Sequence, residues 1–558
     1  MKPRHPYATA VWWVALLAVV PSLCAQETAA PRHTGVPQDW SEGHIVFSRD
    51  TLALHPDLVD REPRVLHQVM QRWQPPNLGV FHGAQPLPTA AGKSGSHRDW
   101  SVSPGGRLSP FRYAAKFSFD PNAPPDCTND YVVFGLATPG VTGGRANLVA
   151  YNNLYSDPVN GGGLCDPPIG PGLGPKVLFA YNITTTATTG RIVTSPILSL
   201  DGTKIGFVES IPGTPPTAVF HVLSWTAGEG TIDNAAAPTS MSSVLFSSSA
   251  YDSASSPWID YGADLVYVGS DNGFVYKITG VFHGTPALGG GSWPVPAGIL
   301  HLTSPVLDWV RGELMVGSAN GNLYGINTTS GAVSALIVGA GPSSGIVAPP
   351  IVDVTNGTTF VVSANDGTSA VLVEADTNGM FQITKGRIGL GAHGGTAFNI
   401  HSPAVSNLYF NNPSSGVIRV CGTGPLGPLA ATPFLYTFGF TGTTMDSSPL
   451  AQQIPTNPAN STAARCAGFT EFFNPSVGGG TDYFFFGLTK DCTAAGGDGG
   501  CVAEFTDANP LTIRTTTVSG GPSGIIVDNS STLPQASSIY FTAEGINTAY
   551  KFTQAGLN

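Results

Sequence analysis

The sequence predicts an all-β fold, a β-propeller of about eight four-stranded blades, and three observations lead to that prediction. A phrase recurs along the chain, in which a small residue and Pro precede an apolar run, a turn, a second apolar run ending in Gly-Ser, and an Asn-Gly turn. Its openings are 45 to 53 residues apart between residues 257 and 403. Turn formers are abundant, with 69 Gly and 47 Pro, while charged residues make up only 11% of the chain.

The clearest copies of the phrase are residues 255–276 and 303–324. β-Branched and aromatic residues suit a pleated, half-buried surface, and Asn-Gly supplies the positive φ of a hairpin turn. Each copy therefore predicts three short strands joined by tight turns. Repetition on this scale is typical of a propeller or another stacked array.

The openings give the expected number of blades. They fall near residues 196, 257, 305, 350, 403 and 449, with degenerate versions near Ala115 and Gly524. The wider gaps coincide with Gly/Pro-rich stretches at 156–174 and 452–500, which we expect to be enlarged loops. Eight openings favour eight blades, and a seven-bladed ring with one miscounted insert is the alternative.

Residues 1–25 have the features of a secretory signal peptide. Lys2 and Arg4 precede an apolar stretch at 11–20, and Ala25 is a small residue at the expected cleavage point. The apolar stretch is too short to cross a bilayer comfortably, and we expect no transmembrane segment after the signal. We therefore expect a secreted or periplasmic protein, and Cys24 leaves a lipid-anchored envelope protein as a second interpretation.

The segment 26–111 does not repeat, and we place the propeller at 112–558. Within the segment, the apolar spacing over 60–73 predicts a short amphipathic helix. This helix is expected either to plug or cap one face of the ring or to cover a blade edge. Residues 82–110, rich in Gly, Ser and Pro, are expected to form a linker or a loose wrapping segment.

Six cysteines remain after removal of the signal, and an even number in an exported chain indicates disulfides. Nearest-neighbour pairing is attractive because each pair brackets a Gly-rich stretch, although the sequence allows fifteen connectivities. The chain has no Cys-x-x-Cys motif, which argues against zinc ligation. The disulfide candidates are Cys127, Cys165, Cys421, Cys466, Cys492 and Cys501.

The sequence has no Gly-x-Ser-x-Gly, His-Glu-x-x-His or P-loop motif. His393 and His401 lie in a Gly-rich region and are candidates to line a central channel, with a structural role as the alternative. We expect no catalytic residue, no cofactor and no metal site. Asp and Asn in the turns are explained by hairpin chemistry, and a structural calcium ion at one blade loop remains the alternative.

Residues 312–331 follow a strand, Asn-Gly turn, strand and closing turn pattern that resembles the quinoprotein-type (PQQ-like) propeller repeat. That resemblance implies a propeller like those of outer-membrane assembly scaffolds and pyrroloquinoline-quinone alcohol dehydrogenases. The family's Trp, four residues after the closing Gly331, is replaced by Ala335. The dehydrogenases also carry two adjacent cysteines, and no two cysteines are adjacent here. We therefore expect the fold without bound pyrroloquinoline quinone.

The net charge of −11 is spread without a basic block, which argues against a nucleic-acid partner. We predict a monomeric, secreted bacterial propeller that acts as a non-catalytic binding or scaffolding module for an unknown protein or carbohydrate ligand. Turns between second and third strands meet at one face, which makes Asp271, Asn320 and Asp366 the binding candidates. The alternative is an exported enzyme at the channel mouth, either a divergent quinoprotein oxidoreductase or a carbohydrate-active lyase or hydrolase.

Overall fold

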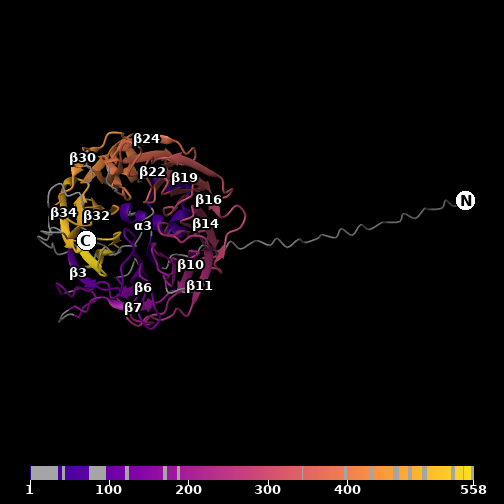
Figure 1. The fold of residues 1–558 in the computed structure, drawn as a ribbon, viewed down its shortest axis with the longest axis vertical. Coiled ribbons are helices and arrows are strands. Elements are labelled where there is room, and N and C mark those ends of the chain that lie inside the picture. The colour runs from indigo at the N-terminus through magenta and orange to yellow at the C-terminus, as the bar shows by residue number, and fades with distance from the viewer. Residues whose placement is uncertain are drawn as a thin grey trace. The chain divides into compact units, whose positions relative to one another are not determined.

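Eight four-stranded blades form a closed ring in the computed structural model of the chain (Figure 1). The predicted fold class is confirmed, and the blade count is eight rather than seven. The structure describes Met1 and residues 35–39, 44–73, 96–119, 125–161, 163–167, 172–184, 189–341, 344–394, 399–426, 429, 432–456, 464–475, 480–492, 499–529, 535–544 and 546–554. The expected signal peptide lies outside the described residues, except for Met1.

The first four blades follow one another along the chain, and each pairs its strands in sequence order. Blade 1 consists of β4 (Ala115–Ser118), β5 (Tyr131–Gly135), β6 (Leu148–Asn152) and β7 (Lys176–Tyr181). Blade 2 consists of β8 (Ile197–Leu198), β9 (Lys204–Ile211), β10 (Thr217–Ser224) and β11 (Met241–Ser247). Blade 3 consists of β12 (Trp258–Asp260), β13 (Leu265–Gly269), β14 (Phe274–Thr279) and β15 (Ala287–Leu288), and the short strand β16 (Val295–Pro296) also pairs with β14. Blade 4 consists of β17 (Val306–Asp308), β18 (Glu313–Gly317), β19 (Asn322–Asn327) and β20 (Val333–Ile337).

The remaining blades continue the ring. Blade 5 consists of β21 (Ile351–Asp353), β22 (Thr358–Ser363), β23 (Val371–Asp376) and β24 (Gln382–Arg387). Blade 6 consists of β25 (Ala404–Val405), β26 (Ile418–Thr423), β27 (Pro433–Phe438) and β30 (Leu450–Gln453). Blade 7 consists of β31 (Thr470–Asn474), β32 (Thr481–Leu488), β33 (Gly500–Thr506) and β34 (Asn509–Val518). Blade 8 consists of β35 (Ile526–Asn529), β36 (Ser537–Thr542), β37 (Ala549–Gln554) and β3 (Ser96–Val102). Shorter elements between these strands are η1 (Gly391–Gly394), α4 (Asn407–Asn411), η2 (Pro413–Ser415) and the hairpin β28 (Phe440–Thr441) with β29 (Thr444–Met445).

The Asn-Gly turns lie where the sequence predicts them. Gly273 and Gly321 have φ of 83° and 86°, in the left-handed region that favours glycine. They close the β13–β14 and β18–β19 hairpins, whose antiparallel registers end at the pairs Gly269↔Val275 and Gly317↔Leu323. These two copies therefore set the hairpin register of blades 3 and 4.

The expected opening near residue 449 is wrong as the start of a blade. The Pro at that position precedes β30, the outermost strand of blade 6, and blade 7 begins at β31. The stretch 452–500 is accordingly not one enlarged loop, since it contains β31 and β32. A Ser-Pro turn can precede any strand, and the inserted β28–β29 hairpin displaces this one from the start of a blade.

The ring is closed by β3, which is the outermost strand of blade 8 and pairs with β37 in antiparallel register (Figure 1). β3 lies within the segment 26–111, part of which was expected to be a linker. The boundary expected at residue 112 therefore does not coincide with the ring, because a strand from before the first blade completes the last one.

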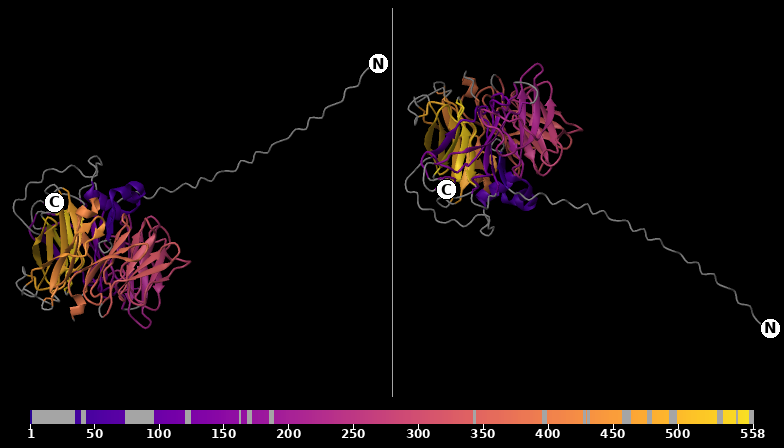
Figure 2. Two further views of the ribbon diagram at one scale, coloured as in Figure 1. Left: turned by 90° about the horizontal axis from the view of Figure 1, so that it is seen from above. Right: turned by 90° about the horizontal axis from the view of Figure 1, so that it is seen from below.

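The N-terminal segment also fills one end of the central channel. It contains β1 (Val36–Gln38), β2 (His44–Val46), α1 (Arg49–Leu54), α2 (Asp57–Arg61) and α3 (Pro63–Arg72). β1 pairs with the first strand of blade 1 and β2 pairs with the first strand of blade 5. Since these blades lie on opposite sides of an eight-bladed ring, the segment spans the channel, and its helices lie at one face in both side views (Figure 2). Of the two roles expected for the helix, the structure has the plug, and we use that name for residues 35–39 and 44–73.

Buried side chains of α3 hold the plug in place. The Arg64 guanidinium lies 3.8 Å from the ring centre of Trp258 and donates to the Ile259 carbonyl at 3.0 Å and to Glu62 at 3.0 Å. Arg72 forms an ion pair with Glu471 of blade 7. The plug is therefore tied to the inner strands of blades 3 and 7.

Apolar side chains pack between neighbouring blades. Between blades 2 and 3, for example, Val208 and Phe220 meet Val266 and Ile278, and all four are fully buried. Each such side chain contributes roughly 1.5–3 kcal/mol through burial. The core is thus divided among the blade interfaces, as expected for a ring of repeated sheets.

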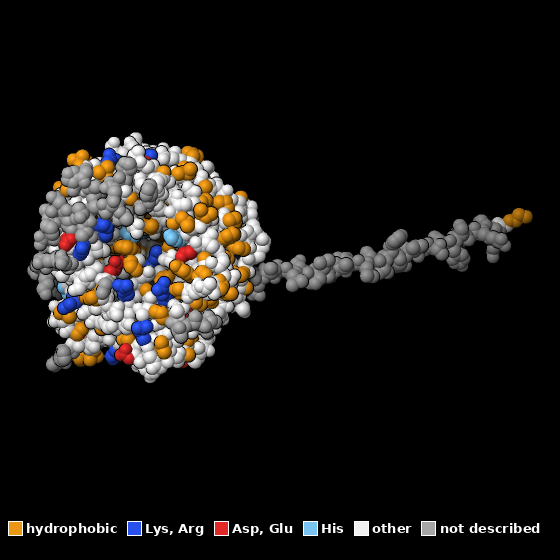
Figure 3. All heavy atoms as spheres, in the orientation of Figure 1, with side chains coloured by type: hydrophobic (Ala, Val, Ile, Leu, Met, Phe, Trp, Pro, Cys, Tyr) orange, Lys and Arg blue, Asp and Glu red, His pale blue; other side chains and the backbone are white. Residues whose placement is uncertain are grey.

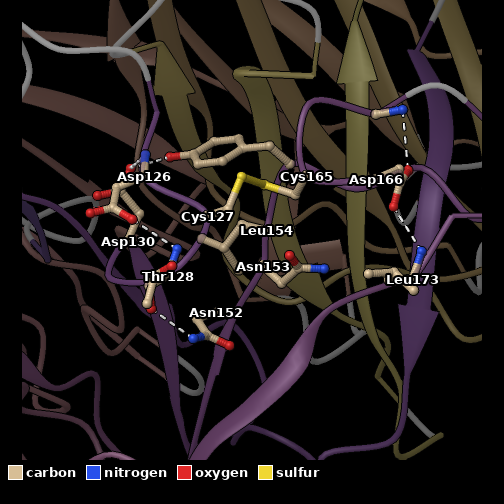
Figure 4. Close-up of a disulfide and its surroundings, with 12 residues drawn as sticks. Asp126, Cys127, Thr128, Asp130, Asn152, Asn153, Leu154, Cys165, Asp166 and Leu173 are labelled. Carbon is tan, nitrogen blue, oxygen red and sulfur yellow. Dashed lines mark hydrogen bonds between the residues drawn. A yellow bond between two sulfur atoms is a disulfide. The ribbon is translucent and has the colours of Figure 1, made fainter. Parts of the chain in front are cut away.

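Three disulfides join successive cysteines, Cys127–Cys165, Cys421–Cys466 and Cys492–Cys501, which is the nearest-neighbour pattern that the sequence favours. Figure 4 shows the first of them, which connects the β4–β5 loop to the long loop between β6 and β7. In that loop Asp166 accepts a hydrogen bond from the Leu173 backbone at 2.7 Å. The insert expected at 156–174 is therefore an enlarged loop stapled to its own blade.

Candidate functional site

A pocket of about 210 Å³ lies at the ring axis, at the end of the channel opposite the plug. Successive strands of a blade are antiparallel, so the loop before each first strand and the turn between its second and third strands share one face. Figure 3 shows a hollow near the centre of this face, with histidine, basic and acidic side chains beside it. We call the pocket the mouth and define it by residues 110–113, 253–254, 301–302, 346–349, 399, 401–402 and 468. These segments precede the first strands of six of the eight blades.

Phe111 takes a backbone conformation rarely seen outside glycine, with φ of 61°. Its ring lies against the His401 imidazole, with ring centres 3.8 Å apart, and its N–H donates to Glu544 Oε1 at 3.0 Å. Burial raises the pKa of Glu544 to about 7. A non-glycine residue at positive φ costs on the order of 1 kcal/mol or more and persists where its surroundings hold it. The stacking on His401 and the hydrogen bond to Glu544 hold Phe111 in this conformation.

Two histidines and an arginine give the mouth its polar character. Burial and the positive charge of Arg112 lower the pKa of His401 to about 3, so this ring is neutral at ordinary pH. His301 is exposed. Burial raises the pKa of Asp271, and hydrogen bonds from Ser253 and the charge of His301 oppose that effect. The mouth therefore combines one permanent cation with a neutral ring stack.

The three predicted face-loop residues lie in turns on the mouth's face, and each has local partners. Ser253 Oγ donates to Asp271 Oδ2 at 2.7 Å, and Asn320 Nδ2 donates to the Tyr324 hydroxyl at 3.1 Å. Asp366 forms an ion pair of 2.8 Å with Lys385. Only Asp271 contacts a residue of the mouth itself.

Of the two candidate channel histidines, His401 lines the mouth. His393 belongs to η1, and its side chain lies outside the described part of the structure. Arg112, Phe111 and His301 were not among the residues predicted from the sequence. Their only signal is position, since they directly precede strands β4 and β17 in loops otherwise poor in charge.

A second, smaller cavity of about 60 Å³ lies between the plug and blades 6 to 8. Gln38 turns both amide atoms toward buried space without a hydrogen-bond partner. Burial lowers the pKa of the lining His44 to about 4. A cavity of this size with polar walls holds a few water molecules. We therefore assign it to hydration of the plug and not to a ligand.

One group of three possible metal ligands occurs among the described residues, formed by His97, Asp99 and Asp157. The His97 Nε2 atom lies 3.1 Å from Asp99 and 3.9 Å from Asp157. The Lys551 ammonium already pairs with Asp99. A cation bound here would lie beside that ammonium, so the group carries no metal assignment.

No protein-family model and no curated protein matches the chain. Solved structures similar to it include BamB from Moraxella catarrhalis, with 12% identity, a TM-score of 0.42 and coverage of 82% of this chain and 99% of that one. The WD40 domain of Toxoplasma gondii coronin has 10% identity, a TM-score of 0.36 and coverage of 70% and 81%. The WD40 domain of Neurospora crassa Pan2 has 10% identity, a TM-score of 0.36 and coverage of 64% and 88%. The β-propeller fold itself rests on the eight blades of the structure.

Proposed function

We propose that this chain is an exported propeller that serves as a binding or scaffolding module, with its ligand engaged at the mouth. One observation carries the proposal. The chain fills one end of its own channel with the plug, while loops from six blades converge on a pocket at the other end. Among the described residues, the plug covers one end of the channel, and the mouth at the other end is open to another molecule.

The size of the mouth favours a macromolecular ligand over a small molecule. Its volume of about 210 Å³ is below the roughly 300–1,000 Å³ of pockets that enclose a whole small molecule. A pocket of that size suits one inserted side chain or sugar unit, with the rest of the ligand on the surrounding face. We propose a protein ligand, and the turns that contain Asp271, Asn320 and Asp366 would contact its outer parts.

The composition of the mouth gives less support to an enzyme there. The described residues that line it include no Asp or Glu, so the paired carboxylates that a glycosidase uses are not brought together. Phe111 and His401 offer a flat ring surface and Arg112 a cation, which are binding groups rather than an acid and base pair. We retain the propeller's likeness to the quinoprotein-type repeat as a likeness of architecture.

Export is supported by the disulfides. All six cysteines after residue 25 are paired, and such bonds persist in oxidising compartments. Among the described helices, none is long and apolar enough to cross a membrane. We propose a secreted or periplasmic location from the disulfides together with the predicted signal peptide.

The test is a quantitative capture experiment with a matched pair of variants. Asn399 is an exposed residue of the mouth, and Val310 is an exposed residue in the β17–β18 turn at the plug's face. We expect the purified chain to retain a defined protein from culture medium or envelope fractions, Asn399→Trp to reduce that capture at least tenfold, and Val310→Trp to leave it unchanged. Equal capture by Asn399→Trp and the unmodified chain would refute the mouth as the binding site.

A further inference from the structure

Three strands of blade 2 bring a serine, a histidine and a glutamate into line on one face of the sheet. The Ser243 hydroxyl on β11 lies 2.8 Å from Nδ1 of His221 on β10. The opposite ring nitrogen, Nε2, lies 3.0 Å from the Glu209 carboxylate on β9. His221 and Glu209 are fully buried, whereas Ser243 is exposed. This set lies apart from the mouth and has no part in the function proposed there.

The hydrogen-bond network fixes the roles of the two ring nitrogens. A carboxylate can only accept, so we assign the proton on Nε2 as donated to Glu209. Nδ1 is then the acceptor of the Ser243 hydroxyl proton. A serine whose proton is held by a histidine, itself oriented by a buried carboxylate, is the arrangement that activates a serine as a nucleophile.

The strand register leaves a backbone donor beside this serine. The Ser224 N–H donates to the Ser240 carbonyl, so Ser224 and Ser240 form a hydrogen-bonded pair. Hydrogen-bonded and non-hydrogen-bonded pairs alternate along an antiparallel ladder. His221 and Ser243, three residues further along, therefore form a non-hydrogen-bonded pair. The N–H of Ser243 therefore points away from β10. β11 is the edge strand of its sheet, and that N–H faces the open edge, where it can donate to an oxyanion that forms on a molecule attached to Ser243.

We propose that Ser243 is an activated nucleophile that attacks small, reactive acyl compounds such as esters of short-chain acids. In the first step a bond forms between Oγ and the acyl carbon, and the hydroxyl proton passes to Nδ1 of His221. The bond between the acyl carbon and the leaving oxygen then breaks, and that oxygen takes the proton from Nδ1. Water releases the acid from Ser243 by the same steps in reverse. The exposed position of Ser243 on an edge strand suits compact substrates without a deep pocket.

The first test uses a fluorophosphonate probe, which forms an Oγ–P bond and releases fluoride. The neighbouring Ser242 is also exposed, but it pairs with Val222 and therefore projects from the opposite face of the sheet. We expect one label for each chain, mapped by mass spectrometry to Ser243, lost in Ser243→Ala and kept in Ser242→Ala. A label on another residue, equal labelling of Ser243→Ala, or no label at all would overturn the proposal.

The second test separates activation by His221 from simple exposure of a hydroxyl. We expect His221→Gln, checked by circular dichroism and melting, to slow labelling of Ser243 by about 100-fold or more, the scale of general base catalysis. Unchanged labelling by a folded His221→Gln protein would show that Ser243 reacts without activation and would refute the relay.

Discussion

The seam at which β3 closes the ring depends on a buried ion pair, and its removal tests how the ring is held together. Asp99 and Lys551 are 452 residues apart in sequence and both are fully buried. Asp99 is the extra residue of a bulge in β3, between the pairs Arg98↔Phe552 and Trp100↔Lys551. The bulge turns its carboxylate toward the ammonium, and Thr553 donates to the same oxygen at 2.6 Å.

Replacing Asp99 by Asn removes the carboxylate that pairs directly with the buried Lys551 ammonium, which costs about 3–5 kcal/mol. Lys551→Met alone should cost a similar amount. The double variant buries neither charge of the pair, so its cost should be smaller than the sum by about 2 kcal/mol or more, the coupling energy of the pair. Burial alone would raise the pKa of Asp99, but Lys551, helped by His97 and Thr553, holds that pKa below its ordinary value. The contribution of Asp99 is therefore present at neutral pH and is lost as pH falls below the usual range of an aspartate.

The assay is urea-induced unfolding at pH 7, followed by circular dichroism and by limited proteolysis before β3. Lys385→Met serves as the control, because Lys385 forms an ion pair with Asp366 but is 41% exposed, and exposed pairs contribute at most about 1 kcal/mol. The reasoning would be refuted if Asp99→Asn cost no more than Lys385→Met, or if the costs of the two seam variants simply added.

Three further perturbations test the plug, the Cys127–Cys165 disulfide and the buried side chain of Glu374. Arg64→Ala removes the contacts that tie α3 to blade 3 and should weaken the plug by about 3–5 kcal/mol, seen as faster hydrogen exchange over residues 63–72. Replacing Cys127 and Cys165 by Ser opens a 38-residue loop and should cost about 4 kcal/mol in chemical denaturation. Burial raises the pKa of Glu374 to about 7, so the folded chain keeps a proton that the unfolded chain loses. Stability should therefore fall by about 2–3 kcal/mol as pH rises from about 4.5 to 7, and Glu374→Gln should remove that slope.

Local signals account for the parts of the fold that the sequence predicts well. The turns at Gly273 and Gly321 are recognisable because only a few residue types tolerate their backbone conformation. The misplaced opening near 449 shows the limit of such signals, since a turn marks the start of a strand but not its place within a blade. β3 has no repeat phrase, and its partner β37 lies at the other end of the chain, so nothing local predicts that pairing.

The candidate sites were harder to predict because their residues meet only in the folded ring. His401 was a candidate for a channel position, but Phe111 and His301 belong to different loops that converge there. Glu209 and Ser243 flank His221 at separations of 12 and 22 residues, which match no catalytic motif. Their alignment depends on the registers of three adjacent strands, which a single sequence does not specify.

The seam and the mouth are physically one structure, and this links stability to binding. The Arg112 carbonyl accepts a hydrogen bond from Gly524 of the segment before β35, and the Phe111 N–H donates to Glu544 between β36 and β37. Both contacts cross from blade 8 to the segment that leads into blade 1, so the shape of the mouth requires a closed ring. If this is correct, Asp99→Asn should lose captured ligand at a lower urea concentration than that at which the blades lose their circular dichroism. Coincident loss of binding and strand structure would instead mean that the ring unfolds as one cooperative unit, and that the seam has no separate control over the mouth.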